Sequence, residues 1–297
     1  MDIIIPTRNR PHLTAEAVRA VQAQTYQDWH LHVVDDASTD GTVAHLRDLI
    51  DGDGRVTLHT LARCGGGNPA RQRAFERSAA PLVAICDSDD LWAPDKLARQ
   101  VAAWDGAESD PGLLLCRHDV IDGEGRPVAR AQPLRRGRRW NPFTAFNTST
   151  PLLSRRLITE VGGFAPTTPY PWVTTDHMEL FLRLTQSITP RTIPEVLVHC
   201  RHHAGPRNSD AERTRDAAVE AEALLGAARA RVAGSRRTEA WLEAWVAGRY
   251  LEVGDLRSAR PHATAALRAG GPFTGSRLLA HYGPWALRQL VRQRGVA

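Results

Sequence analysis

The chain has 297 residues, of which 42% are hydrophobic and 24% are charged, as is ordinary for a soluble globular protein with one large domain and an appendage. No uninterrupted apolar run approaches the roughly 20 residues that a membrane-spanning helix needs. The net charge is +5, but the chain has no zinc-finger spacing, basic heptad region or aromatic RNA-binding motif, which excludes the common nucleic-acid-binding classes.

Two features indicate the cellular compartment. The start of the chain, Met1–Pro6, is too short and wrongly charged for a signal peptide, and we expect it to form the first strand. The cysteines are far apart and show no paired metal-ligand spacing, so we expect no disulfide. They are Cys64, Cys86, Cys116 and Cys200. We therefore expect a cytoplasmic protein.

Strands and helices are expected to alternate through the first 86 residues. The expected strands are Ile3–Ile5, Trp29–Val34, Val56–Leu61 and Pro81–Cys86, and the helices between them are Leu13–Gln24, Val43–Ile50 and Ala70–Ala79. Thr14 is a candidate cap of the first helix. This alternation predicts a parallel α/β sheet, with the polar loops that follow the strands meeting at one edge.

The last of these strands runs into an acidic cluster, Asp87-Ser88-Asp89-Asp90. Carboxylates this close raise one another's pKa and destabilise the fold unless a cation joins them. Their oxygens suit Mg²⁺ or Mn²⁺, and such an ion in turn recruits phosphate. The alternative is an acidic turn that caps a helix beginning near Ala93–Asp95.

The second half of the chain is less regular. Strands are expected at Leu113–Ile121, Asn147–Leu153 and Ile193–Cys200, and helices at Arg155–Val161, stopped by Gly162-Gly163, and at Asp176–Ser187. The polar, arginine-rich segment Asp122–Asn141 indicates a mobile loop. From about Asp210 the chain becomes alanine-rich, and Trp241–Val253 with Leu256–Ala269 resembles one tetratricopeptide hairpin. We expect a main domain at 1–210 and a helical region at 211–297.

Three segments stand in order at spacings that match a known family: Ile3–Arg10, Val33–Thr42 and Asp87–Asp90. Gly162–Phe164, Asp176–Arg183 and Arg201–His203 continue the pattern. Over residues 1 to about 210 the chain resembles the family 2 glycosyltransferases. The resemblance implies a GT-A fold, an α/β architecture with a Rossmann-like, mostly parallel central sheet, followed here by a C-terminal α-helical appendage.

The resemblance also implies an activity. Such an enzyme moves a sugar from a nucleotide diphosphate sugar, here taken as UDP-linked, to an acceptor hydroxyl with inversion at the anomeric carbon. A divalent ion, Mn²⁺ or Mg²⁺, neutralises the charge that develops on the leaving diphosphate. The altered acid pair described below leaves an alternative open, a non-catalytic protein that binds a sugar nucleotide or a glycan. A sugar-nucleotide pyrophosphorylase is a weaker rival, because Pro6–Asn9 does not resemble its phosphate loop.

Several residues match family positions that bind the donor. Thr7 and Arg8 are expected to contact the nucleobase or its phosphates, with Arg8 standing where the family usually has an aromatic residue. Asp36 is expected to accept hydrogen bonds from the base or ribose, or else to be a turn acid. Arg71 reaches the nucleotide or is an exposed helix arginine. Asp87 corresponds to the acid on the ribose side.

The metal site and the general base are also implied by the resemblance. Asp89 is the expected metal ligand, Asp90 the expected cap of the next helix, and His203 completes the metal or diphosphate site. The family's base is the second acid of a pair that opens a helix. Counting back from Arg183 places Asp176 on the first acid and His177 on the second, whereas a one-residue insertion makes Asp176 the base. Asp176 is the favoured base and His177 the substitute, since imidazole titrates near neutrality.

The acceptor is not identified by the sequence and could be a polysaccharide, a lipid-linked intermediate, a protein or a small natural product. Trp140, Phe143 and Trp172 lie where acceptor loops fall in such folds, and aromatic faces suit sugar rings. The run Arg135–Arg139 is either a solvated loop or a contact for an anionic acceptor or a membrane surface. The C-terminal helices could self-associate or pack on the main domain.

Overall fold

The computed structural model describes residues 1–107, 109–129, 147–164, 190–202, 236–252 and 254–270, and the short stretches 180, 183–184, 188, 219, 221–222 and 225–226. The chain divides into two compact units. The first comprises Met1–Trp172 and Asp176–Gly205, and the second comprises Val173–Thr175 and Pro206–Ala297.

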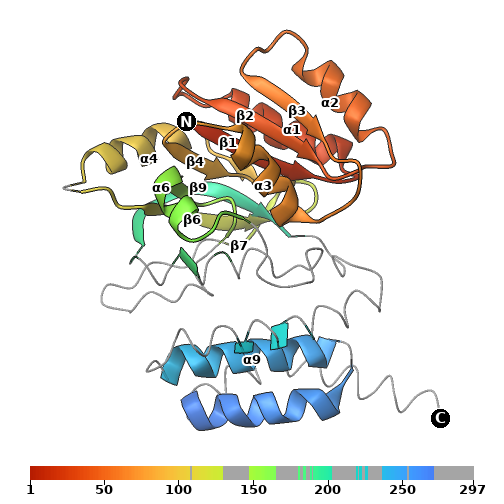
Figure 1. Ribbon diagram of the computed structural model, residues 1–297, viewed down its shortest axis with the longest axis vertical. Helices are drawn as coiled ribbons and strands as arrows, with labels where there is room; N and C mark the ends of the chain where they lie inside the picture. The colour runs from red at the N-terminus through yellow and green to blue at the C-terminus, as the bar shows by residue number, and fades with distance from the viewer. Residues whose placement is uncertain are drawn as a thin grey trace. The chain divides into compact units, whose positions relative to one another are not determined.

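A nine-stranded sheet forms the centre of the first unit in the part of the chain that the structure describes (Figure 1). Its strands are β1 (Asp2–Thr7), β2 (His30–Asp35), β3 (Val56–Thr60), β4 (Leu82–Ile85), β5 (Leu91–Trp92), β6 (Leu113–Ile121), β7 (Pro127–Ala129), β8 (Leu152–Ser154) and β9 (Arg191–Arg201). The order is β3-β2-β1-β4-β8-β6-β9-β5, with β7 beside β6.

The sheet is mixed, and its parallel part is the one that the alternating pattern predicts. Strands β3, β2, β1 and β4 run parallel to one another. Strand β8 is antiparallel to both β4 and β6, β9 is parallel to β6, and β5 is antiparallel to β9. Because β1 to β4 are parallel, their last residues meet at one side of the sheet, which we call the carboxyl edge.

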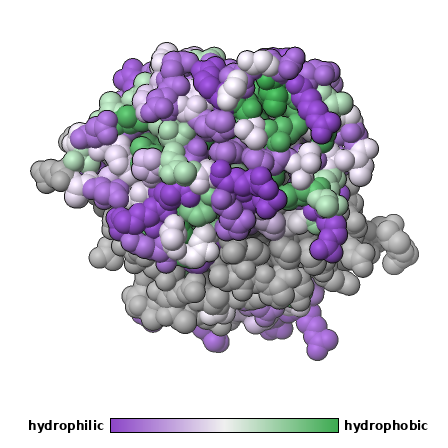
Figure 2. All heavy atoms as spheres, turned by 45° about the horizontal axis from the view of Figure 1, so that its top comes forward, coloured by the Kyte–Doolittle hydropathy of each residue, from purple (hydrophilic) through white to green (hydrophobic). Residues whose placement is uncertain are grey.

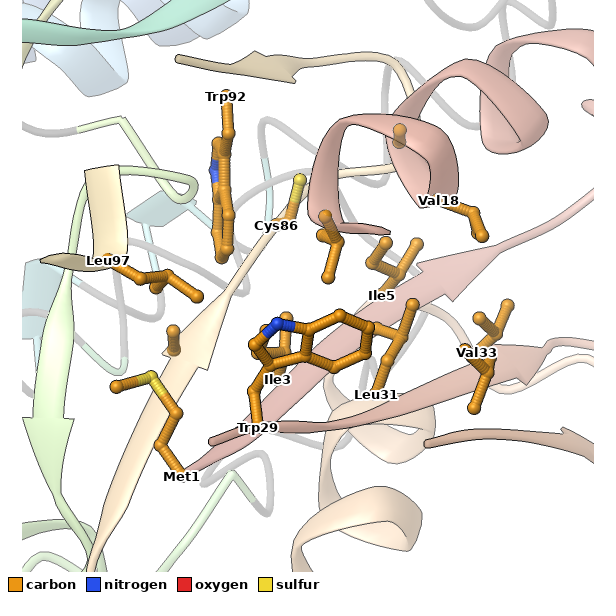
Figure 3. Packing of buried hydrophobic residues seen from close by; sticks show 14 of the residues in the cluster. Met1, Ile3, Ile5, Val18, Trp29, Leu31, Val33, Cys86, Trp92 and Leu97 are labelled. Carbon is orange, nitrogen blue, oxygen red and sulfur yellow. The ribbon is translucent and has the colours of Figure 1, made fainter. Parts of the chain in front are cut away.

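Helices cover both faces of the sheet. They are α1 (Pro11–Gln22), α2 (Thr42–Ile50), α3 (Gly67–Arg77), α4 (Lys96–Asp105) and α6 (Arg155–Glu160). Ile3 and Ile5 belong to a core that also contains buried side chains of α1, α2 and α4, and Figure 3 shows part of this packing. Ile4 points into a second core, which contains buried side chains of α3 and α6. Burial on both faces explains why these strands are continuously apolar.

Two predicted helix caps are wrong. Helix α1 begins at Pro11, three residues before Thr14. Proline suits the first position of a helix because the backbone N–H that it lacks would have no partner there. Thr14 is buried and its hydroxyl donates to the carbonyl of Arg10 over 2.7 Å. Helix α4 begins after Asp95, and Asp90 is engaged elsewhere, as described below.

The other boundaries differ by a few residues. Helix α3 begins at Gly67, three residues before the predicted start at Ala70. Strand β8 begins at Leu152 because the residues before it form a turn, closed by a 3.0 Å hydrogen bond from Thr150 N to the carbonyl of Asn147. Strand β7 lies within the segment predicted as a mobile loop, most of which falls outside the described residues.

Two further features of the chain are its cysteines and its surface. All four cysteines are free. Hydrophilic side chains predominate on the face in Figure 2, with hydrophobic ones in small separate areas. Within the described ranges, no helix is long and apolar enough to cross a bilayer.

The second unit contains the predicted helical hairpin. Helix α9 (Arg236–Glu252) is followed by a turn at Gly254, whose φ of +76° suits glycine, and by a helix at 256–270. The buried carboxylate of Glu243 lies 2.8 Å from Nδ1 of His262, which joins the two helices.

Candidate active site

The loops after β1 and β2 interlock at the carboxyl edge. The backbone N–H of Asn9 donates to the hydroxyl of Ser38 over 2.8 Å, and Thr39 N donates to the side-chain oxygen of Asn9 over 2.9 Å. Asn9 and Ala37 have φ angles of 52° and 55°, which are uncommon for residues other than glycine. Backbone held in this region often marks a binding site.

Asp36, just after β2, holds the loop of residues 63–66 that precedes α3, which we call the glycine loop. Its two oxygens accept the backbone N–H groups of Gly65 and Gly66 over 2.7 and 2.8 Å, and the Cys64 thiol lies 3.2 Å away. The residue is only 5% exposed. A carboxylate offers about four acceptor positions, so Asp36 can still accept a hydrogen bond from a ligand. It is therefore a loop anchor as well as a candidate ligand-binding acid.

Thr7 is the last residue of β1, and Arg8 directly follows it. Thr7 is buried, and its hydroxyl lies 2.6 Å from that of Thr14. Arg8 reaches Cys64, with 2.6 Å between Nη1 and Sγ, which brings its guanidinium beside Asp36. Burial and the hydrogen bond to Asp36 raise the pKa of the Cys64 thiol.

The acidic loop, residues Asp87–Asp90, joins β4 to β5, and its first and third residues each pair with an arginine. Asp87 Oδ1 lies 2.9 Å from Nη2 of Arg71, which is 5% exposed on α3. Asp89 Oδ2 lies 2.9 Å from Nη1 of Arg10, in the loop after β1. Two guanidinium groups thus stand among these carboxylates, and guanidinium is also well suited to phosphate.

Asp90 is buried and faces the interior of the unit. Its carboxylate accepts from the Ser149 hydroxyl over 2.6 Å and from the backbone N–H of Arg201 over 3.0 Å. Burial, followed by the charges of Asp87 and Asp89, raises the pKa of Asp90 to about 7. Asp90 therefore anchors the acidic loop to β9 and to the turn before β8.

Arg201 holds the acidic loop in place by binding several segments of the chain at once. It is 2% exposed, and its guanidinium donates to three acceptors from distant segments. These are the carbonyl of Asp89 at 3.0 Å, the carbonyl of Gly123 at 2.8 Å and Oε2 of Glu16 at 2.5 Å. The sequence pattern included Arg201 but assigned it no role, and it assigned none to Arg10 or Ser149.

The structure brings most of the predicted donor residues together. Asp36 binds the loop that begins α3, Arg71 on α3 pairs with Asp87, and Asp89 lies on the same loop as Asp87. Arg8 reaches the Asp36 end of this edge through Cys64. Arg71 is buried, so the interpretation as an exposed helix arginine is wrong. The candidate bases Asp176 and His177 and the candidate ligand His203 lie outside the described residues.

The described residues suit a metal that is shared with a ligand. Among them, no group of three His, Cys, Asp or Glu side chains could hold a metal ion. Magnesium is usually bound by one or two carboxylates together with phosphate oxygens, and not by a cage of protein ligands. Asp87 and Asp89, on one short loop, provide that kind of partial site.

The comparison with protein families decides what these motifs belong to. Residues 2–165 match the model of glycosyl transferase family 2. The chain belongs to this family. The matched stretch runs from β1 to just beyond α6 and contains the acidic loop, the glycine loop and Asp36.

A curated relative and two solved structures are similar to this family 2 member. The Escherichia coli protein WfgD, named a UDP-Glc:α-D-GlcNAc-diphosphoundecaprenol β-1,3-glucosyltransferase, is 34% identical over 102 residues. That alignment covers 34% of this chain and 40% of WfgD, so the chain matches less than half of the relative's length.

The solved structures extend the likeness to nearly the whole chain. TarS 1-349 of S. aureus, in complex with UDP-GlcNAc, has a TM-score of 0.63 at 14% identity, covering 98% of this chain and 87% of TarS 1-349. The mannosyltransferase PcManGT of Pyrobaculum calidifontis, in complex with GDP-Man and Mn²⁺, has a TM-score of 0.60 at 23% identity, covering 97% of this chain and 83% of its own. At these identities the likeness shows the fold, and the predicted GT-A architecture is confirmed.

Proposed function

We propose that this family 2 member transfers a sugar from a UDP-linked donor to an acceptor hydroxyl, with inversion at the anomeric carbon. The observation that carries the proposal is the carboxyl edge, where Asp36, the Asp87–Arg71 pair and the Asp89–Arg10 pair meet. Acids suited to a base, a ribose and a metal ion stand here beside two arginines suited to a diphosphate.

The donor's nucleoside is assigned to the β1 and β2 end of this edge. Asp36 accepts an N–H of the base, and Arg8, beside it, offers a planar guanidinium for stacking. Asp87 accepts a ribose hydroxyl. The UDP donor is supported by the names of WfgD and of the TarS 1-349 complex, although PcManGT was solved with a guanine nucleotide.

The chemistry requires one bond to form as another breaks. The acceptor oxygen attacks the anomeric carbon, the bond from that carbon to the diphosphate oxygen breaks, and its electron pair stays on the diphosphate. Asp89 would hold a divalent ion, which would neutralise that charge, and the Mn²⁺ of PcManGT supports this assignment. Arg71 and Arg10 add positive charge beside the same loop.

A general base takes the proton of the acceptor hydroxyl. We assign this role to Asp176, with His177 as the substitute, and assign His203 to the metal or diphosphate site, all three on the family pattern. An Asp176→Asn variant that keeps donor affinity but loses transfer by about 10²-fold or more fits this role.

The first experiment is calorimetric titration of UDP, GDP, ADP and CDP, each with and without Mn²⁺, into wild type and Asp89→Asn. We expect UDP to bind most tightly, Mn²⁺ to tighten it about tenfold or more, and Asp89→Asn to abolish that enhancement. Asp48→Asn, an exposed acid on α2, is the matched control and should behave as wild type. No nucleotide binding under any metal condition contradicts the proposal.

Turnover separates a transferase from a non-catalytic binding protein. Radiolabelled UDP-glucose and UDP-GlcNAc are supplied with lipid-linked, polysaccharide and small-molecule acceptors, including GlcNAc-diphosphoundecaprenol, the acceptor that the name of WfgD prints. Release of UDP that depends on an acceptor supports transfer. Tight binding with no UDP release from any donor favours the binding protein.

A further inference from the structure

Arg10 occupies the position from which a cation would bind Asp89. Its Nη1 lies 2.9 Å from Asp89 Oδ2, and the two residues are 79 positions apart in the chain. The Asp89 side chain is 8% exposed, and the Arg10 side chain is 35% exposed. The pair is therefore half-shielded from solvent, with the arginine on its outer side.

The backbones of both residues are held in place. Arg10 N donates to the Thr42 hydroxyl over 3.1 Å, and the Arg10 carbonyl accepts the backbone N–H of Thr14 over 3.0 Å. The carbonyl of Asp89 is bound by Nε of Arg201 at 3.0 Å. Fixed backbones leave the long, partly exposed Arg10 side chain as the part of this pair that can move.

We propose that Arg10 is a positioning residue. It neutralises the charge of Asp89 before the donor binds and then releases the carboxylate, so that the divalent cation can bind it. This inference rests on the proposed function. When the donor's diphosphate arrives, the guanidinium of Arg10 exchanges the carboxylate for phosphate oxygens, and the cation takes its place on Asp89.

The charges around the pair explain why this exchange couples two ligands. Removing Arg10 would take one positive charge away from Asp89, whose neighbours in the loop are the acids Asp87 and Asp90, and the loop would attract a cation more strongly. With Arg10 present, Mn²⁺ alone must break the ion pair and repel the arginine. A diphosphate gives the displaced guanidinium a new partner, so nucleotide and metal each raise the affinity of the other.

The test is Mn²⁺ binding, followed by the electron paramagnetic resonance signal of free Mn²⁺, in the presence and absence of UDP. The variants are Arg10→Gln, which removes the charge, and Arg10→Lys, which keeps it. Arg19→Gln is the matched control, because Arg19 is an exposed arginine on the same α1 helix. Circular dichroism and the thermal midpoint confirm that each variant is folded.

We expect Arg10→Gln to bind Mn²⁺ alone about five- to tenfold more tightly than wild type, the effect of losing one partly shielded ion pair. The enhancement of Mn²⁺ binding by UDP should fall by a similar factor. Arg10→Lys and Arg19→Gln should stay within about twofold of wild type. The inference is overturned if the Arg10→Gln variant binds Mn²⁺ no more tightly than wild type does.

The outcome is distinguishable from a failure of the proposed function. If wild type binds no UDP, the proposed donor site fails, while the titration with Mn²⁺ alone still decides whether Arg10 competes for Asp89. If wild type shows metal-dependent UDP binding that Asp89→Asn abolishes, and Arg10→Gln leaves both Mn²⁺ affinity and coupling unchanged, only the role of Arg10 is wrong.

Discussion

Asp36 Oδ1 accepts the backbone N–H of Gly65 over 2.7 Å, so a residue at the end of β2 fixes the loop that begins α3. The neighbouring oxygen binds Gly66 N at 2.8 Å in the same way. Gly66 itself has a φ of +91°, which only glycine adopts easily. One carboxylate therefore shapes the loop at the start of α3, the helix whose Arg71 pairs with Asp87.

Asp36→Asn tests this anchor. An amide has one oxygen and one NH₂ group, so one of the two glycine N–H groups would face a donor. We expect a loss of about 1–3 kcal/mol in the free energy of unfolding and at least a tenfold weaker affinity for UDP. Urea denaturation and calorimetry measure the two effects, with Asp48→Asn as the control. Unchanged stability contradicts the anchoring role.

Arg201 should be intolerant even of lysine. Arg201→Met leaves the carbonyls of Asp89 and Gly123 without this donor, and we expect a loss of about 3–5 kcal/mol in the free energy of unfolding. Arg201→Lys keeps the charge, but an ammonium cannot reproduce the fork that reaches three acceptors, so at least half of the loss should remain. Denaturant unfolding of both variants measures this. Full rescue by lysine would show that charge alone matters.

A row of histidines on β2 and β3 predicts weakening in acid. His59 Nε2 lies 3.1 Å from His32 Nδ1, and burial, followed by the charges of His32, Arg77, Arg73 and His30, lowers the pKa of His59 to about 4. Its ordinary value is 6.5, so between these values the unfolded chain binds more protons than the folded one. The free energy of unfolding should therefore fall as the pH drops from about 6.5 to 4.

His59→Gln removes the proton uptake of this residue and should flatten that part of the curve. Urea unfolding at several pH values between 4 and 7 measures the slope for wild type and variant. His45→Gln, a half-buried histidine on α2, is the control. The same slope in wild type and His59→Gln would show that His59 does not sense pH.

Lys96, the only lysine of the chain, predicts that stability also rises with pH in the alkaline range. It is fully buried, its Nζ lies 3.7 Å from the centre of the Trp92 ring and 2.8 Å from Gln100, and burial lowers its pKa from 10.5 to about 8. Between these values only the unfolded chain keeps the proton, so this residue makes the free energy of unfolding rise with pH. The free energy of unfolding of wild type, measured by urea titration relative to that of Lys96→Met, should therefore rise from pH 8 to 10. A constant difference contradicts a neutral buried lysine.

Local patterns predicted the parallel half of the sheet and the acids at its edge, for a physical reason. Strands β1, β2 and β4 are buried on both faces and so appear as short apolar runs, and their polar ends stand next to them in sequence. The helix starts were less accurate, because Pro11 and Gly67 begin helices earlier than the apolar spacing indicates.

The partners of the acids were not predictable from such patterns. Asp89 meets Arg10 across 79 positions, and Asp90 meets Ser149 across 59 and the backbone of Arg201 across 111. The first contact follows from β1 lying beside β4, and the other two from the places of β8 and β9 in the strand order, which no local spacing encodes. The assignment of Asp90 as a helix cap failed because α4 begins only after Asp95, whereas Asp90 accepts from Ser149 and Arg201.

The position of β9 bears on how the protein acquires its site during folding. Strand β9 lies between β6 and β5 and ends in Arg201, although the stretch that matches the family model stops at residue 165. A fragment cut there would keep every acid of the edge and lose the residue that holds two of them. The acidic loop should thus become ordered only after a strand made more than a hundred residues later has joined the sheet. During synthesis on the ribosome, the chain would therefore become able to bind its donor only after β9 has been made.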